Sequence, residues 1–100
     1  MRLIVNDNAE YFNCIYDCVT SSIEGGWRYS VMQVSFSNEK ISSKFFYEND
    51  DGEIVGFRPL NFIAPLNAAD AIKRHYDESG VSFDGMEFRI NKDGVELSFY

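Results

Sequence analysis

Apolar residues recur three or four positions apart near the beginning of the chain, which is the spacing that places them on one face of a helix. The repeat runs through residues 7–24 and comprises Phe12, Ile15, Tyr16, Val19 and Ile23. Asp7 stands three residues before Glu10, as in a capping box, and Gly25-Gly26 follows the run. The pattern predicts a first helix over residues 7–24 that stops at the glycine pair.

Strand-like segments follow this helix. Residues 27–36 and 41–47 are rich in aromatic and β-branched side chains, and a short polar turn separates them. Asp51-Gly52 is a hairpin signal, and it precedes a third short run at residues 53–58, after which a proline ends the strand. These features predict three consecutive antiparallel strands.

A second helix is predicted to begin at Asn67, a candidate N-cap, and to end at Gly80, which suits the position just after a helix C-terminus. Its apolar residues are few, and the larger ones are Ile72 and Tyr76. We therefore expect this helix to lie on the sheet with one face in water.

The end of the chain has the clearest pattern. Apolar residues alternate with polar ones on both sides of a turn at residues 91–94, as in a half-buried hairpin with one solvated face. No repeat, low-complexity tract or linker interrupts the chain. The pattern predicts one α+β domain over residues 1–100, an antiparallel sheet of four or five strands with two helices, in the order α-β-β-(β)-α-β-β.

The charge narrows the class of partner. Sixteen Asp and Glu stand against nine Lys and Arg, and the net charge is −7. A surface this acidic repels phosphate backbones and anionic membranes and attracts basic macromolecules, so we expect neither direct nucleic-acid binding nor membrane binding. No apolar run is long enough for a signal peptide or a membrane span, and we expect a cytoplasmic protein.

The sequence predicts no catalytic residue, cofactor or metal ion. Cys14 and Cys18, one helical turn apart, would be reduced, and only His75 and carboxylates are present to complete a zinc site with them. The two cysteines are better explained as small apolar side chains packed under a neighbouring segment, or as part of a helix face that contacts a partner. Motifs for nucleotide binding, hydrolases and zinc proteases are missing from the sequence, so we expect a non-enzymatic protein.

The densest acidic group surrounds the predicted turn between the second and third strands. It consists of Glu48, Asp50, Asp51 and Glu53. A solvated hairpin tip and a patch for a partner's Lys and Arg both explain it. A calcium loop is a weaker alternative, because the segment lacks the alternate spacing and closing Glu of an EF-hand.

A second acidic set flanks the predicted end of the second helix: Asp77, Glu78 and Asp84. Negative charge at a helix C-terminus opposes the helix dipole, although Lys73 and Arg74 one turn earlier offset it. Either a solvated helix end or a contact with a partner accounts for this set.

Three segments carry a family resemblance. Residues 26–29 (GWRY) open a strand after a helix, residues 43–47 (SKFFY) form an aromatic strand before a polar turn, and residues 88–100 form a closing hairpin with an Asp-Gly turn. In this order they resemble the YezG-like antitoxin or immunity-protein family. Members of that family neutralise toxins delivered between competing bacterial cells, as in contact-dependent growth inhibition.

The resemblance implies a cytoplasmic immunity protein that binds the C-terminal domain of a cognate toxin, often a nuclease. The charge agrees, because carboxylates can occupy a basic cleft built for phosphates. We expect Glu48, Asp50, Asp51 and Glu53 to anchor the partner, with Tyr47 as a central contact and the second acidic set as further contacts. The alternative is a small adaptor or assembly module whose sheet edge pairs with another chain.

Overall fold

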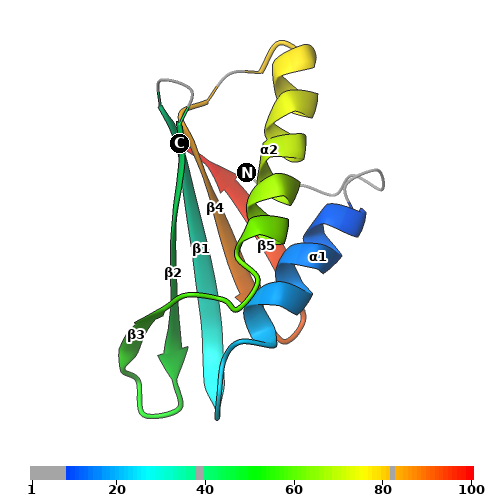
Figure 1. Cartoon of the computed structure of the whole chain (residues 1–100). Helices are drawn as coiled ribbons and strands as arrows, with labels where there is room; N and C mark the ends of the chain where they lie inside the picture. The colour runs from blue at the N-terminus through cyan, green and yellow to red at the C-terminus, as the bar shows by residue number, and fades with distance from the viewer. Residues whose placement is uncertain (1–8, 38–39, 82) are drawn as a thin grey trace.

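Two helices lie on one face of an antiparallel sheet of five strands (Figure 1). The structure is a computed structural model, and it describes residues 9–37, 40–81 and 83–100. In chain order the elements are α1 (Ala9–Thr20), β1 (Trp27–Ser37), β2 (Lys40–Asn49), β3 (Ile54–Phe57), α2 (Ile63–Glu78), β4 (Gly85–Asn91) and β5 (Gly94–Phe99). The predicted α+β class and the predicted order of elements are confirmed.

β1 is the central strand of the sheet, whose order is β3-β2-β1-β4-β5. It pairs with β2 along almost its whole length, and on its other side Ser30–Ser35 pair with Gly85–Ile90. The N-terminal meander β1-β2-β3 and the C-terminal hairpin β4-β5 are therefore joined into one sheet by the contact between β1 and β4.

Alternation along β1 directs three fully buried residues toward the helices: Ser30, Met32 and Val34. Val31 points to the opposite, helix-free side of the sheet, which we call the open face. It is nevertheless only 3% exposed, because Phe46 and Arg89 stand opposite it in the two neighbouring strands. The Arg89 guanidinium also lies over the Tyr29 ring, 4.1 Å from its centroid. The open face is thus partly covered by its own side chains.

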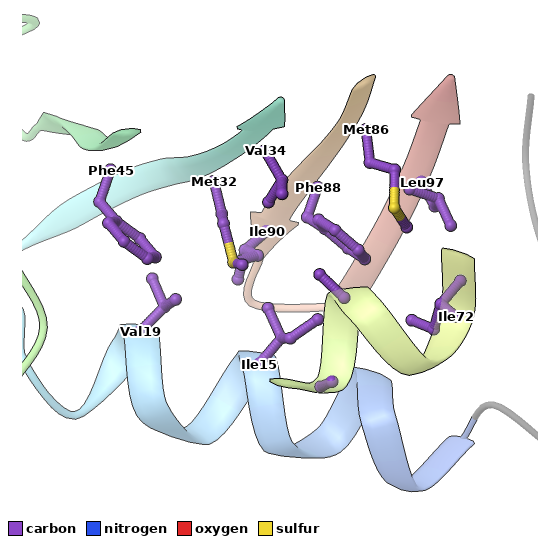
Figure 2. Close-up of a cluster of buried hydrophobic side chains, with 12 residues drawn as sticks. Ile15, Val19, Met32, Val34, Phe45, Ile72, Met86, Phe88, Ile90 and Leu97 are labelled. Carbon is purple, nitrogen blue, oxygen red and sulfur yellow. The ribbon is translucent and has the colours of Figure 1, made fainter. Parts of the chain in front are cut away.

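The core fills the space between the sheet and the helices, and Figure 2 shows its side chains converging there. Its buried residues are Ile15, Val19, Met32, Val34, Phe45, Ala68, Ala69, Ile72, Met86, Phe88, Ile90 and Leu97. Both helices contribute the apolar positions that their periodicity predicts, and the C-terminal hairpin contributes its apolar face. Burying each large aliphatic or aromatic side chain stabilises the fold by about 1.5–3 kcal/mol.

α1 ends at Thr20, before the predicted end at Glu24. The Thr20 hydroxyl donates to the Tyr16 carbonyl at 2.7 Å, and the Ser22 hydroxyl donates to the Cys18 carbonyl at 3.1 Å. Hydroxyl side chains that bond nearby carbonyls compete with the helical backbone bonds, so the Thr-Ser-Ser run stops the helix early.

The two signals predicted to bound the first helix have different outcomes. Asp7, the predicted capping residue, lies outside the described residues. Gly25 has a φ of +83°, as the prediction requires, but it lies in the connection between α1 and β1 rather than at the end of the helix.

α2 begins at Ile63, so the prediction that Asn67 caps the helix is wrong. Pro65 stands in the first turn, where the backbone N–H groups have no intrahelical acceptor and a proline costs no hydrogen bond. The Asn61 side-chain carbonyl accepts a hydrogen bond from the Ala64 N–H at 3.1 Å and satisfies one of these donors. Pro65, which the sequence suggests as a helix boundary, therefore lies within the first turn of α2.

The predicted end of α2 at Gly80 is confirmed. Gly80 has a φ of +84°, and its N–H donates to the Asp77 carbonyl at 3.1 Å. The Val81 N–H donates to the Tyr76 carbonyl at 2.9 Å. These two bonds form a Schellman motif, which needs a residue that tolerates positive φ after the helix.

Burial along α2 predicts how much each of its isoleucines contributes to stability. Ile72 is completely buried in the core, whereas Ile63 is 54% exposed in the first turn. We expect Ile72→Ala to lower the free energy of unfolding by about 2–5 kcal/mol, because it leaves a cavity between helix and sheet. Ile63→Ala, the matched control, should cost less than about 1 kcal/mol. Urea unfolding at equilibrium measures both, and similar losses would contradict the position of α2 on the sheet.

Candidate functional site

The turn between β2 and β3 carries the densest acidic group, and we call Glu48, Asp50, Asp51 and Glu53 the acidic turn. Asn49 organises it. The Asn49 side-chain carbonyl accepts hydrogen bonds from the N–H groups of Asp51, at 3.0 Å, and Glu53, at 2.9 Å. The Asn49 N–H donates to the Glu53 carbonyl at 2.9 Å. The carboxylates therefore project from a hydrogen-bonded frame.

The connection between α1 and β1 packs against the acidic turn. Arg28 Nη2 donates to the Asp50 main-chain carbonyl at 2.9 Å. The Asp50 carboxylate occupies the space that a side chain at position 26 would need, so Gly26 permits this close approach. Glu24 is exposed two residues earlier in the same connection. Pattern reasoning missed the close approach of Gly26 to Asp50, because only the tertiary structure brings this connection to the turn.

The four carboxylates differ in exposure. Asp50, Asp51 and Glu53 are exposed, whereas Glu48 is half-buried within β2 and belongs to the open face. Among the described residues the structure contains no ion pair to any of the four. Their charge is therefore not offset by a direct ion pair within the described residues, and it is available to attract a cationic group.

Tyr47 lies on the opposite side of β2 from Glu48, because successive residues of a strand face opposite sides. It is half-buried, and its ring packs edge-on against Phe57 at a centroid distance of 5.4 Å. The large apolar side chain beside Glu48 on the open face is Ile54, which pairs with Glu48 and is 57% exposed. Tyr29 is the other neighbour of Glu48 on that face. Sequence reasoning missed Ile54, since an isoleucine in a strand normally marks a buried position.

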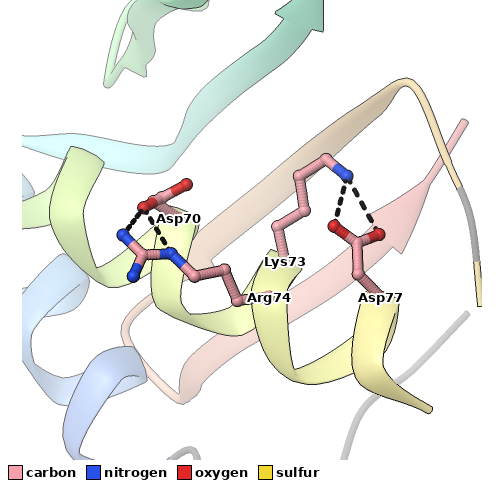
Figure 3. Close-up of polar contacts among 4 residues, drawn as sticks. All are labelled: Asp70, Lys73, Arg74 and Asp77. Atoms are coloured by element: carbon pink, nitrogen blue, oxygen red, sulfur yellow. Dashed lines mark hydrogen bonds and ion pairs between the residues drawn. The ribbon is translucent and has the colours of Figure 1, made fainter. Parts of the chain in front are cut away.

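The second acidic set lies at the other end of the molecule. α2 ends far from the acidic turn in Figure 1, so the structure does not bring the two sets together. Asp77 is paired with Lys73, whose ammonium group reaches both carboxylate oxygens at 3.0 and 2.9 Å (Figure 3). Arg74 pairs with Asp70 rather than with Glu78. The sequence predicts that Lys73 and Arg74 both offset the negative charge of Asp77 and Glu78, and the structure confirms this for Lys73.

Asp84 has a structural role through its backbone. Its carbonyl accepts a hydrogen bond from the Phe36 N–H at 2.9 Å, and its N–H donates to the Tyr100 carbonyl at 2.9 Å. Its side chain is exposed. Asp84 therefore closes the end of the sheet, and its carboxylate stands apart from the acidic turn.

The cysteine pair lies on α1. Cys14 and Cys18 are both half-buried, and Cys14 packs against the core. Burial, together with the neighbouring Cys14 thiol, raises the pKa of Cys18, which keeps it as a thiol rather than as a nucleophilic thiolate near neutral pH. In the part of the chain that the structure describes, no three His, Cys, Asp or Glu side chains are grouped to hold a metal ion.

No family model matches the chain, and no curated protein matches it either. The resemblance to the YezG-like family stays a prediction. Neither of the two described helices is long and apolar enough to cross a membrane.

Asn49 and Asn91 allow a matched test of the frame of the acidic turn. Each ends a strand before a turn, but Asn91 accepts only one turn N–H, that of Asp93, at 2.8 Å. Because Asn49 accepts two, we expect Asn49→Ala to cost about 1 kcal/mol more stability than Asn91→Ala. Amide hydrogen exchange of Asp51 and Glu53 should accelerate only in Asn49→Ala. Unchanged exchange at these two amides would contradict the proposed frame.

Proposed function

We propose that the protein is an immunity protein that binds and neutralises a cognate bacterial toxin domain, a basic nuclease, by stoichiometric occlusion. The single observation that carries the proposal is the acidic turn, whose exposed carboxylates have no ion-pair partner among the described residues. A net charge of −7 adds a long-range field of the same sign. The family resemblance supports the toxin as the partner.

The acidic turn suits a basic cleft for a physical reason. A nuclease cleft holds Arg and Lys where phosphates bind, and carboxylates form charge-assisted hydrogen bonds with the same groups. Because the Asn49 side-chain carbonyl accepts two hydrogen bonds from the turn and holds it, little conformational freedom is lost when the partner binds. The turn therefore acts as a rigid substitute for phosphates, and no bond is made or broken.

Charge and apolar area have separate tasks in this proposal. Exposed carboxylates mainly accelerate encounter, whereas the lasting affinity of an interface comes from a few desolvated side chains at its centre. Ile54, which is 57% exposed beside Glu48, supplies such a side chain, and Tyr29 extends the same patch across the open face. The partner would thus cover the acidic turn and the adjoining corner of the open face.

Charge reversal tests the acidic turn. The binding partner to use is the C-terminal domain of the protein that the adjacent reading frame encodes, with association followed by stopped-flow fluorescence at several salt concentrations. We expect Asp51→Lys with Glu53→Lys to slow association about tenfold or more and to flatten its salt dependence. Glu78→Lys with Asp84→Lys changes the net charge equally at the other end of the molecule, and it should slow association less than about threefold.

Two results would separate the site from the function. Equal effects of the two double variants would show that the acidic turn is not the contact. If the wild-type protein neither binds this domain nor protects cells that express it, the immunity function itself is wrong.

A further inference from the structure

One edge of the sheet is longer than the strand that covers it. β2 runs from Lys40 to Asn49, but β3 pairs only with Phe45–Glu48. Figure 1 shows β3 beside only the lower part of β2. Among the described strands none pairs with the remaining edge at Lys40–Lys44.

A proline explains why β3 ends where it does. The Asn49 N–H donates to the Glu53 carbonyl, so the odd-numbered residues of β2 direct their N–H and C=O groups toward β3. Phe45 pairs with Phe57, and the next such pair would join Ser43 to Pro59, which has no N–H to donate. Ser43 and Ile41 therefore present their main-chain groups outward from the edge.

A groove runs along this free edge. It has a volume of about 770 Å³, and Ile41 and Ser43 of the free edge are among the residues that line it. Phe57, Phe62 and Leu66 give it an apolar wall on the helix side, and Phe46 and Ile54 of the open face also line it. Outward main-chain groups beside an apolar wall are the two features by which a sheet edge binds an extended segment as an additional strand.

The charge of the groove is opposite to that of the whole protein. Lys44 and Arg58 line it, and Lys40 adjoins it next to Ile41, while no carboxylate is among the described residues that line it. The Arg58 guanidinium stacks on the Phe62 ring, 3.9 Å from its centroid, which holds it at the groove. In a protein with a net charge of −7, this basic rim selects for negative charge on the occupant.

We propose that the free edge of β2 binds an extended segment of a protein partner in which apolar side chains alternate with carboxylates. Its apolar side chains pack toward Phe57, Phe62 and Leu66. Its carboxylates face the opposite side, where Lys44 lies, because successive side chains of a strand alternate between faces. None of the four acidic-turn residues lines this site, although Ile54 adjoins both, and the site does not depend on the proposed immunity function.

A second copy of this chain fits the edge poorly. If two copies paired antiparallel through this edge, the outward N–H and C=O groups of both would be hydrogen-bonded only when Ile41 of each copy stands opposite Ser43 of the other. In that register Lys40 of each copy stands directly opposite Lys44 of the other. Like charges directly opposite each other destabilise a strand pair. The occupant is therefore a different chain with acidic positions.

Titration of the ¹⁵N-labelled protein with a synthetic peptide of alternating valine and glutamate tests the proposal. We expect the amide signals of Ile41 and Ser43 to shift and both amides to gain protection from hydrogen exchange. A peptide of alternating valine and glutamine should bind about fivefold more weakly or worse, because it lacks the charge. A peptide of the same composition with its valines grouped should not bind.

Variants of the edge complete the test. Ser43→Pro removes an outward N–H without removing a bond to β1, and it should weaken binding about tenfold. Lys44→Glu leaves the backbone intact and should weaken binding at least threefold, so it decides the matter if Ser43→Pro fails to fold. Lys92→Glu, the same charge change in the turn between β4 and β5, should have no effect. The acidic-turn variant Asp51→Lys with Glu53→Lys should retain peptide binding.

Several results would overturn the proposal. One is the absence of any shift in the amide signals of Ile41 and Ser43 at millimolar peptide. Another is a set of amide shifts confined to the other edge strand, β5. A third is equal affinity for the charged and the neutral peptide. Aggregation of Lys44→Glu without any peptide binding by the wild-type protein would show that the lysines only protect the edge. Dimers of the wild-type protein through this edge would show that the occupant is a second copy.

Discussion

The pairing of β1 with β4 is the contact on which the rest of this structure depends. Without it the chain would form a three-stranded meander and a separate hairpin, and an isolated hairpin is marginal in water. The pairing sets Met32 beside Phe88 and Val34 beside Met86, all fully buried. It creates an apolar surface wide enough for both helices to cover, and burial of that surface drives folding.

The same arrangement decides what remains accessible. Because both helices cover one face, the open face and the two sheet edges are left to face solvent. The short β3, limited by Pro59, leaves part of the β2 edge free beside an apolar wall. The two surfaces to which we assign binding therefore follow from where the core lies and from where one strand must end.

Charge is segregated along the β2 side of the molecule. Carboxylates gather where β2 turns into β3, while Lys40, Lys44 and Arg58 gather along the free edge. At the end of α2, Lys73 neutralises Asp77 locally. The net charge of −7 therefore conceals an acidic end and a basic edge, which suit different partners.

The sequence by itself determined the type and order of the elements, because hydrophobic periodicity is a local property that survives without knowledge of neighbours. It also located the acidic turn and the helix end at Gly80, where local backbone chemistry decides. It misplaced the start of α2, since Pro65 is compatible with a first turn as well as with a break. Only the tertiary structure decided that Asp50 packs against Gly26, that Tyr47 and Ile54 face opposite sides, and that β2 keeps a free edge. These depend on strand order and register, which are set by contacts between residues distant in the chain.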